Sequence, residues 1–156
     1  MNPITAGADF LNSRDLQKRF ESLKDDFDCL IQEVRDTLER VDVANDRDDV
    51  NTEFEDLGSA FNSLKTWIED DDDSNEFFAL KALIDEAGGY GDWNGGETLI
   101  REDKFVDYCR AIAYDCGDVE RDGDLDKYMD WDKYAADMDS DYMDVEFNDH
   151  TYKMRA

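Results

Sequence analysis

Two long runs of regularly spaced apolar residues constrain the fold of this chain more than any other feature. The first run advances in steps of four and three residues, with one slip near Leu38, through Leu16, Phe20, Leu23, Phe27, Leu30, Val34, Leu38 and Val41. The second run comprises Val50, Phe54, Leu57, Phe61, Leu64 and Ile68. Steps of this kind place apolar side chains along one face of an α-helix. Turn-forming residues at 45–48 separate the runs, so the sequence predicts an antiparallel helical hairpin over residues 10–69.

A third helix is predicted after the hairpin. The acidic residues at 69–73 oppose the macrodipole at a helix C-terminus, so the second helix is expected to end there. The same charges suit the start of a following helix, which Ser74 or Asn75 would cap. Its inward-facing residues are expected to be Phe77, Leu80, Leu83 and Ile84. Residues 1–87 are therefore predicted to form a helical region.

Five glycines between residues 88 and 96 mark the main boundary in the chain. Beyond them the sequence predicts a short strand at 97–100 and a helix that Asp103 caps and that continues to about Asp115. Asp130 is expected to cap another helix, and alternating residues at 143–147 and 151–154 predict a terminal hairpin. The predicted fold class is α+β, with an N-terminal helical hairpin or bundle followed by a small α+β domain, residues 88–156, that contains a short antiparallel sheet.

Net charge restricts the partners of the chain. There are 43 acidic and 17 basic residues, a formal net charge of -26, and such a field repels nucleic acid and anionic membranes. We therefore expect cations or basic protein surfaces as partners, with no direct contact to nucleic acid or membrane. The chain starts with no basic segment followed by an apolar run, and no stretch is long and apolar enough to span a bilayer. A cytoplasmic protein is expected.

Catalysis is not expected from this composition. His150 is the only histidine, and it falls in the predicted terminal turn with no partner visible in the sequence. Nucleophilic triads therefore lack their usual base, and the three cysteines with this one histidine do not form a zinc-binding pattern. The sequence predicts a protein that is not an enzyme and that needs no cofactor.

One stretch partly follows the calcium-binding loop of an EF-hand. Asp118, Asp122 and Asp124 are the candidate metal ligands, and Gly123 occupies the sixth position of the loop. The twelfth position is Met129, where the motif requires a bidentate glutamate, so no metal site is predicted. A calcium-binding module is kept as an alternative reading of the chain.

The acidic residues themselves provide the best functional clue. B-form DNA carries about one charge per 1.7 Å of its axis, and a helix rises about 1.5 Å per residue. Carboxylates every three or four residues on neighbouring elements can therefore approximate a row of phosphates. The alternative is that the charge only solvates the surface, as in an acidic structural or adaptor protein adapted to high salt.

A set of motifs in the C-terminal half supports the DNA-like interpretation. They are GYGDW at 89–93, ETLIRED at 97–103, F-x-D-Y at 105–108, Met129-Asp130-Trp131 followed by Ala135-Ala136, Asp141-Tyr142, and V-E-F-x-D-x-x-Y at 145–152. In order and spacing they resemble the C-terminal part of ArdA-type antirestriction proteins of phages and mobile elements. The resemblance covers about residues 88–155 and does not extend to the N-terminal half.

The resemblance implies an elongated, dimeric DNA mimic that blocks the DNA-binding groove of a type I restriction-modification enzyme. Because the N-terminal half is not matched, the target could equally be a CRISPR nuclease or another DNA-dependent defence enzyme of the host cell. The carboxylates expected to stand in for phosphates are Asp70, Asp71, Asp72, Asp73, Asp118, Asp122, Asp124, Asp126, Asp132, Asp137, Asp139, Asp141 and Asp144.

Overall fold

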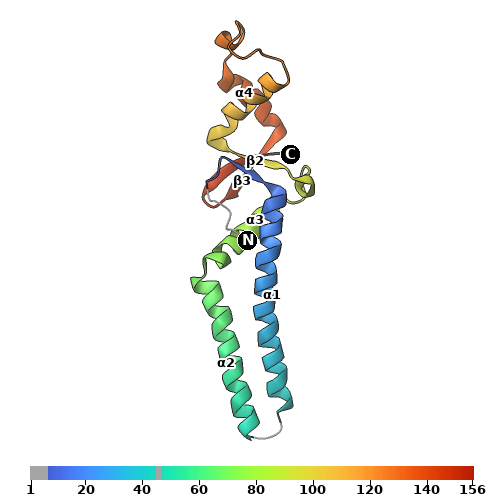
Figure 1. The fold of residues 1–156 in the computed structure, drawn as a ribbon, viewed down its shortest axis with the longest axis vertical. Coiled ribbons are helices and arrows are strands. Elements are labelled where there is room, and N and C mark those ends of the chain that lie inside the picture. The colour runs from blue at the N-terminus through green and yellow to red at the C-terminus, as the bar shows by residue number, and fades with distance from the viewer. Residues whose placement is uncertain (1–6, 45–46) are drawn as a thin grey trace. The chain divides into compact units, whose positions relative to one another are not determined.

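The computed structural model describes residues 7–44 and 47–156. Within them the chain forms five α-helices and one four-stranded antiparallel sheet, which confirms the predicted α+β class (Figure 1). Two compact units divide the chain. Residues 18–81 form the first, which we call the helical unit; residues 82–156 together with residues 7–17 form the second, which we call the sheet unit. No helix in the described ranges is both long and apolar enough to cross a membrane.

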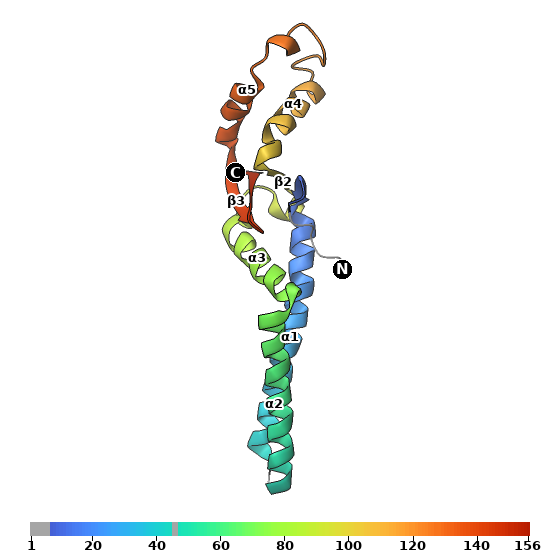
Figure 2. The same cartoon turned by 90° about the vertical axis from the view of Figure 1, so that its left-hand side faces the viewer.

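The predicted helical hairpin is confirmed. Helix α1 (Ser13–Val43) and helix α2 (Arg47–Asp70) run side by side in opposite directions, as both cartoon views show (Figures 1 and 2). The amide of Arg14 donates to the side-chain oxygen of Asn12, 3.0 Å away, so Asn12 caps α1. The turn residues at 45 and 46 lie outside the described residues. Leu23 and Leu57 are buried, in line with the two predicted apolar runs, which form the seams of the hairpin. Phe54, Phe61 and Ile68 of the second run are exposed, so their predicted place in the seam was wrong.

The slip in the first seam has a structural explanation. Leu38 is 49% exposed, whereas the neighbouring Thr37 is 4% exposed. Thr37 continues the steps of three and four that begin at Leu16, and its hydroxyl donates to the main-chain oxygens of Glu33 and Val34, both 2.9 Å away. The prediction that Leu38 faces the partner helix was wrong. A threonine can occupy the seam because its polar atom is satisfied within its own helix.

Helix α3 (Asp72–Ala87) begins two residues earlier than its predicted caps. The amide of Asp73 donates to the carboxylate of Asp71 over 2.9 Å, so Asp71 is the capping residue, whereas the hydroxyl of Ser74 donates to the main-chain oxygen of Ile68. Inside the helical unit, Phe77 stacks on Phe20 with ring centroids 5.4 Å apart. Phe27 and Trp67 join this aromatic cluster, which fixes α3 against the hairpin.

The sheet of the sheet unit has the strand order β1-β2-β4-β3. Its strands are β1 (Phe10–Asn12), β2 (Thr98–Arg101), β3 (Tyr142–Phe147) and β4 (His150–Arg155), and every neighbouring pair is antiparallel. Strands β3 and β4 form the predicted hairpin around the two-residue turn Asn148–Asp149. Both turn residues have positive φ, 49° and 61°, as a type I′ hairpin turn requires. His150 is therefore the first residue of β4 and not a turn residue.

Two helices continue the sheet unit. Helix α4 (Phe105–Asp115) lies beside α5 (Trp131–Met138), as Figure 2 shows. Ile100, Phe105, Cys109 and Ala135 form a buried cluster that joins both helices to β2. Short 3-10 turns cover Trp93–Gly95, Glu102–Lys104, Asp126–Tyr128 and Asp139–Asp141. Asp103 lies in the second of these turns, and it binds Arg101 instead of capping α4.

Strand β1 was not predicted, and it shifts the boundary between the two parts of the chain. Phe10, Leu11 and Asn12 pair with Ile100, Leu99 and Thr98 respectively. Residues 7–17 therefore belong to the sheet unit together with residues 82–87, whereas the sequence division placed residues 1–87 apart from 88–156. The sequence signal is weak because β1 has only three residues.

Candidate partner-binding surface

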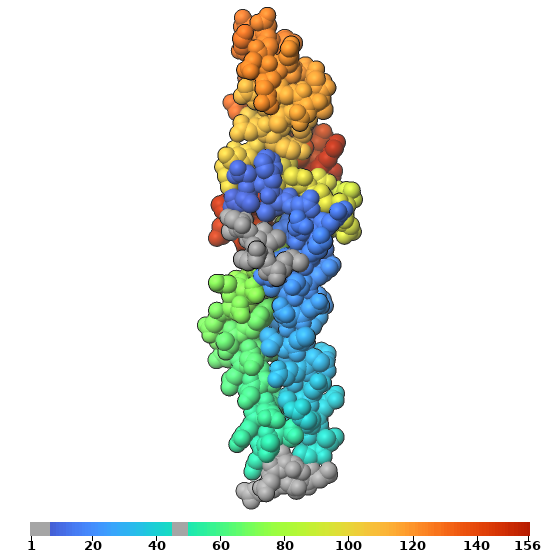
Figure 3. Space-filling model, viewed as in Figure 1, coloured from blue at the N-terminus to red at the C-terminus, as the bar shows by residue number. Residues whose placement is uncertain are grey.

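A long acidic segment runs from the end of α4 to the start of β3. Residues 115–144 contain twelve acidic residues and three basic ones, and they comprise the loop after α4, helix α5 and the turn before β3. We call this segment the acidic surface. Figure 3 shows its loop, coloured orange, open to solvent. Nine of the thirteen carboxylates predicted to replace phosphates belong to it.

The loop of the acidic surface starts from an ordered helix end. The amides of Asp118 and Val119 donate to the main-chain oxygen of Ala113, 3.0 and 3.3 Å away. Gly117 has a φ of 78°, the left-handed conformation that commonly ends a helix. Val119 is buried, whereas Asp118 and Glu120 on either side are exposed. The alternation shows that one side chain anchors the loop while its neighbours face solvent.

Asp126 is the exception among the predicted carboxylates, because its side chain is only 6% exposed. It accepts hydrogen bonds from the hydroxyl of Tyr114 at 2.7 Å and from the amide of Asp122 at 3.0 Å, and it lies 3.5 Å from the guanidinium of Arg110. The bond from Tyr114 holds the pKa of Asp126 below its ordinary value, with further contributions from Asp122 and Arg110. Asp126 therefore organises the loop and is not presented to a partner, which corrects its predicted role.

Arg110 connects this network to the next helix. Its guanidinium lies over the ring of Tyr114, 5.5 Å from the centroid, and over that of Trp131, 5.4 Å from the centroid. Trp131 is the first residue of α5. The arginine thus joins the end of α4 to the start of α5 through cation–π contacts, and the loop between them is held at both ends.

Helix α5 carries the next set of exposed carboxylates. Asp130 caps it as predicted, accepting from the amide of Lys133 at 3.1 Å. Asp132 and Asp137 are exposed on the helix, and Asp141 is exposed just after it. Within the described residues these three aspartates, like Asp118 and Asp122, make no ion pair. They are the carboxylates most available to a basic partner.

Three other predicted aspartates of the acidic surface, Asp124, Asp139 and Asp144, have basic neighbours. Lys153, with 11% of its side chain exposed, lies 2.7 Å from Asp139 and 2.6 Å from Asp144. Burial lowers the pKa of Lys153, but the bonds to these two carboxylates outweigh that effect and raise it above its ordinary value. Sequence reasoning missed Lys153, although a hairpin turning at 148–149 places it directly opposite Asp144. Asp124 lies 3.4 Å from Lys127 but remains fully exposed.

The four aspartates at 70–73 belong to the helical unit and differ from one another. Asp70 and Asp72 are exposed, whereas Asp71 caps α3. Asp73 binds the buried Arg19, which also pairs with Glu76 over 2.8 Å. Only the first and third of this run are therefore open to a partner, and the other two have structural roles.

The partial calcium-binding motif is occupied by interactions of the chain itself. Asp126, at its ninth position, accepts hydrogen bonds from the hydroxyl of Tyr114 and from the amide of Asp122. Asp118 and Asp124 are exposed. Across the described ranges, no group of three or more histidine, cysteine, aspartate or glutamate side chains is arranged to hold a metal ion.

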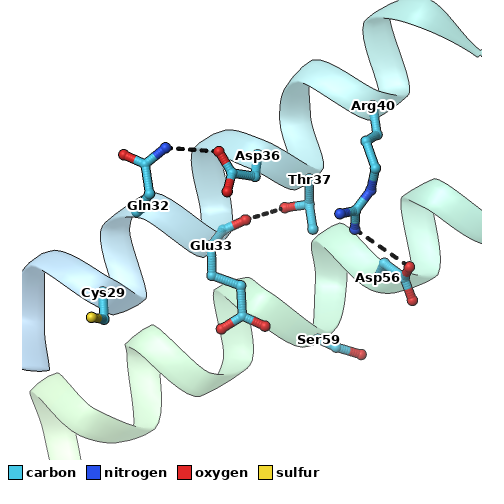
Figure 4. A pocket seen from close by; sticks show the side chains of 8 residues that line it. All are labelled: Cys29, Gln32, Glu33, Asp36, Thr37, Arg40, Asp56 and Ser59. Carbon is cyan, nitrogen blue, oxygen red and sulfur yellow. Dashed lines mark hydrogen bonds and ion pairs between the residues drawn. The ribbon is translucent and has the colours of Figure 1, made fainter.

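A hollow of about 520 Å³ lies along the helical hairpin. Figure 4 shows that its lining is polar and comes from both helices. Gln32 donates to Asp36 over 2.7 Å, and Arg40 lies 3.6 Å from Asp56. Cys29 is exposed at one end, while the histidine of the chain belongs to the sheet unit. Gln32, Asp36, Thr37, Arg40, Asp56 and Ser59 of the lining take part in hydrogen bonds or salt bridges within the helical unit, and the lining residues do not form a nucleophile–base pair.

Comparisons of the chain with protein-family models, with curated proteins and with solved structures find no match. The resemblance to ArdA-type proteins accordingly rests on the sequence motifs alone.

Proposed function

We propose that this protein is a DNA-mimic inhibitor of phage or mobile-element origin that acts in the cytoplasm of a host cell. Its acidic surface would occupy the DNA-binding groove of a defence enzyme, with no direct binding to nucleic acid and no catalysis. A type I restriction-modification enzyme is the first target to test because of the motifs shared with ArdA-type proteins. A CRISPR nuclease or another DNA-dependent nuclease is the second.

One observation carries this proposal: five exposed carboxylates without ion pairs are fixed on an internally braced framework. They are Asp118, Asp122, Asp132, Asp137 and Asp141. The Asp126 network and the α5 cap hold the segments that bear them. A groove that binds phosphates with lysine and arginine gains the same ion-pair energy from fixed carboxylates, and releases counterions from both surfaces. A surface that served only solubility would not need this bracing.

The experiment is an inhibition assay with the purified protein. Cleavage of duplex DNA by a type I restriction enzyme is measured as the protein concentration rises, at several salt concentrations and at several DNA concentrations. We expect inhibition that added duplex DNA relieves and that weakens as salt screens the charges. The same assay with a CRISPR nuclease distinguishes the two targets. Inhibition that DNA does not relieve, or the absence of inhibition of every DNA-dependent nuclease in the panel, would refute the proposal.

Salt also separates this function from the alternative of a structural protein adapted to high salt. A salt-adapted acidic protein unfolds when salt is withdrawn, because its carboxylates then repel one another without screening. We expect the helical content, followed by circular dichroism at 222 nm, to be retained at low salt. Unfolding in low salt together with unaffected nuclease activity would favour the structural alternative.

A further inference from the structure

Helix α2 has a second apolar face that its partner helix does not cover. Phe54, Phe61 and Ile68 are 56%, 52% and 42% exposed, and they are spaced seven residues apart. Leu57 and Ala60, by contrast, are buried against the rest of the helical unit. Residues seven apart lie on one side of a helix, so the three exposed side chains form a continuous stripe. We call the stripe, together with Gly58 and Lys65 between its members, the outer face of α2.

Negative charge is missing from this part of the helix. Residues 57–68 contain no aspartate or glutamate, although 43 of the 156 residues are acidic, and this is the longest stretch without an acidic residue in the chain. Phe61, Leu64, Lys65, Ile68 and Glu69 line a depression of about 210 Å³ here. A basic partner would be matched by carboxylates, whereas a partner that is itself strongly acidic can approach only where they are absent.

Gly58 provides an independent observation on the same face. It lies four residues after Phe54 and three before Phe61, in the middle of a 24-residue helix. Glycine in a helix interior costs about 1 kcal/mol relative to alanine. Within the described part of the chain, no atom outside the helix lies within 4 Å of the position that a Cβ would take. The chain itself therefore gives no packing reason for a glycine here, whereas the close approach of another backbone would.

We propose that the outer face of α2 binds the same face of a second copy of this chain and forms a symmetric dimer. A second copy is the partner that best fits the absence of acidic residues, because it carries the same net charge of -26. The same helix position recurs every seven residues along this face, so two copies of the face can pack against each other across a twofold axis. Each exposed phenylalanine presents about half of a ring surface of roughly 200 Å². The four rings of two copies thus supply roughly 400 Å² at the apolar centre of an interface whose usual total is about 1,600 Å².

The molecular mass in solution tests the dimer directly. Sedimentation equilibrium over a range of micromolar concentrations should give twice the chain mass of 18.1 kDa, with a dissociation constant that falls as salt rises, because salt screens the repulsion between two acidic copies. This salt response is opposite to the one expected for binding to a basic groove, so failure of one proposal is distinguishable from failure of the other.

Matched variants locate the interface. Phe61→Asp should raise the dissociation constant by at least about 30-fold, the effect of losing one central buried anchor. Leu38→Asp, which introduces the same charge at a site of similar exposure on α1, should leave it unchanged. Gly58→Leu adds bulk without charge and should also weaken the dimer, while helical content is retained in all three variants. A single-copy mass at all salt concentrations, or a dimer that Phe61→Asp and Gly58→Leu leave intact, would overturn the proposal.

Discussion

Removing five unpaired carboxylates of the acidic surface should weaken inhibition steeply while the fold is preserved. The change is the replacement of five aspartates by asparagine, which keeps their shape and removes their charge. The five positions are Asp118, Asp122, Asp132, Asp137 and Asp141. None makes an ion pair within the described residues, and all are exposed, so their neutralisation removes no bond that holds the sheet unit together.

The expected magnitude follows from the number of charges. An ion pair that stays in contact with solvent contributes about 0.5 kcal/mol, within a range of roughly 0.2–1 kcal/mol. Five such pairs sum to about 2.5 kcal/mol, which is roughly a 70-fold rise in the dissociation constant for the target enzyme. Each single replacement should change it only about twofold. The assay is inhibition of DNA cleavage, with the dissociation constant checked by calorimetric titration at constant salt.

A matched control separates the acidic surface from net charge alone. Five exposed acidic residues of the hairpin are replaced by their amides, which changes the net charge equally. They are Asp25, Asp26, Glu39, Asp42 and Glu55. If charge is recognised locally, this control should retain most of the inhibition. The reasoning fails if both variants lose the same affinity, or if the variant of the acidic surface inhibits as well as the unmodified protein.

Three further predictions concern stability. Leu23→Ala removes a fully buried side chain and should lower the free energy of unfolding, measured in urea, by about 3–4 kcal/mol. Leu38→Ala, at a half-exposed site, should lower it by no more than about 0.5 kcal/mol. Equal losses of stability would contradict the burial seen at these two positions. Asp130→Ala removes the cap of α5 and should cost about 1 kcal/mol in the same titration, a loss that Asp130→Asn should largely avoid. Because the pKa of Asp126 is depressed in the fold, its carboxylate stabilises the fold above the unfolded pKa of about 3.9, and this contribution is lost as pH falls through the lower folded pKa. Asp126→Asn should therefore flatten the pH dependence of the free energy of unfolding below about pH 4. An unchanged dependence would show that the carboxylate is not engaged.

Periodicity made the helical half predictable from the sequence, because each helix of the hairpin buries a stripe of apolar residues. One error is that Phe54, Phe61 and Ile68 of the second run are exposed on α2 and not buried in the seam. Other errors occurred where a polar residue satisfied its own bonds. Thr37 occupies a seam position because its hydroxyl bonds to its own helix, which left Leu38 as the apparent seam residue. Asp71 caps α3 in place of Ser74, and in a run of four aspartates no spacing rule distinguishes the cap from its neighbours.

The acidic surface was predictable as a segment but not residue by residue. Exposure of an aspartate depends on which arginine, lysine or tyrosine reaches it, and those partners are distant in sequence for Asp73 and near for Asp126. Asp126 is hidden by a tyrosine twelve residues earlier, a spacing that carries no recognised pattern. Strand β1 is too short for its alternation to be read, and only its pairing with β2 reveals it.

The position of β1 at the outer edge of the sheet has a consequence for how the chain is made. A ribosome that adds about 5–20 residues per second releases β1 roughly 4–17 s before its partner β2. Residues of the α1–α2 hairpin are synthesised within that interval, so β1 has no strand to pair with until β2 follows it. A fragment started at Gly88 would lack this strand and leave the hydrogen-bonding edge of β2 open to other chains. The sheet unit therefore needs segments from both ends of the described chain if it is to stay free of aggregation.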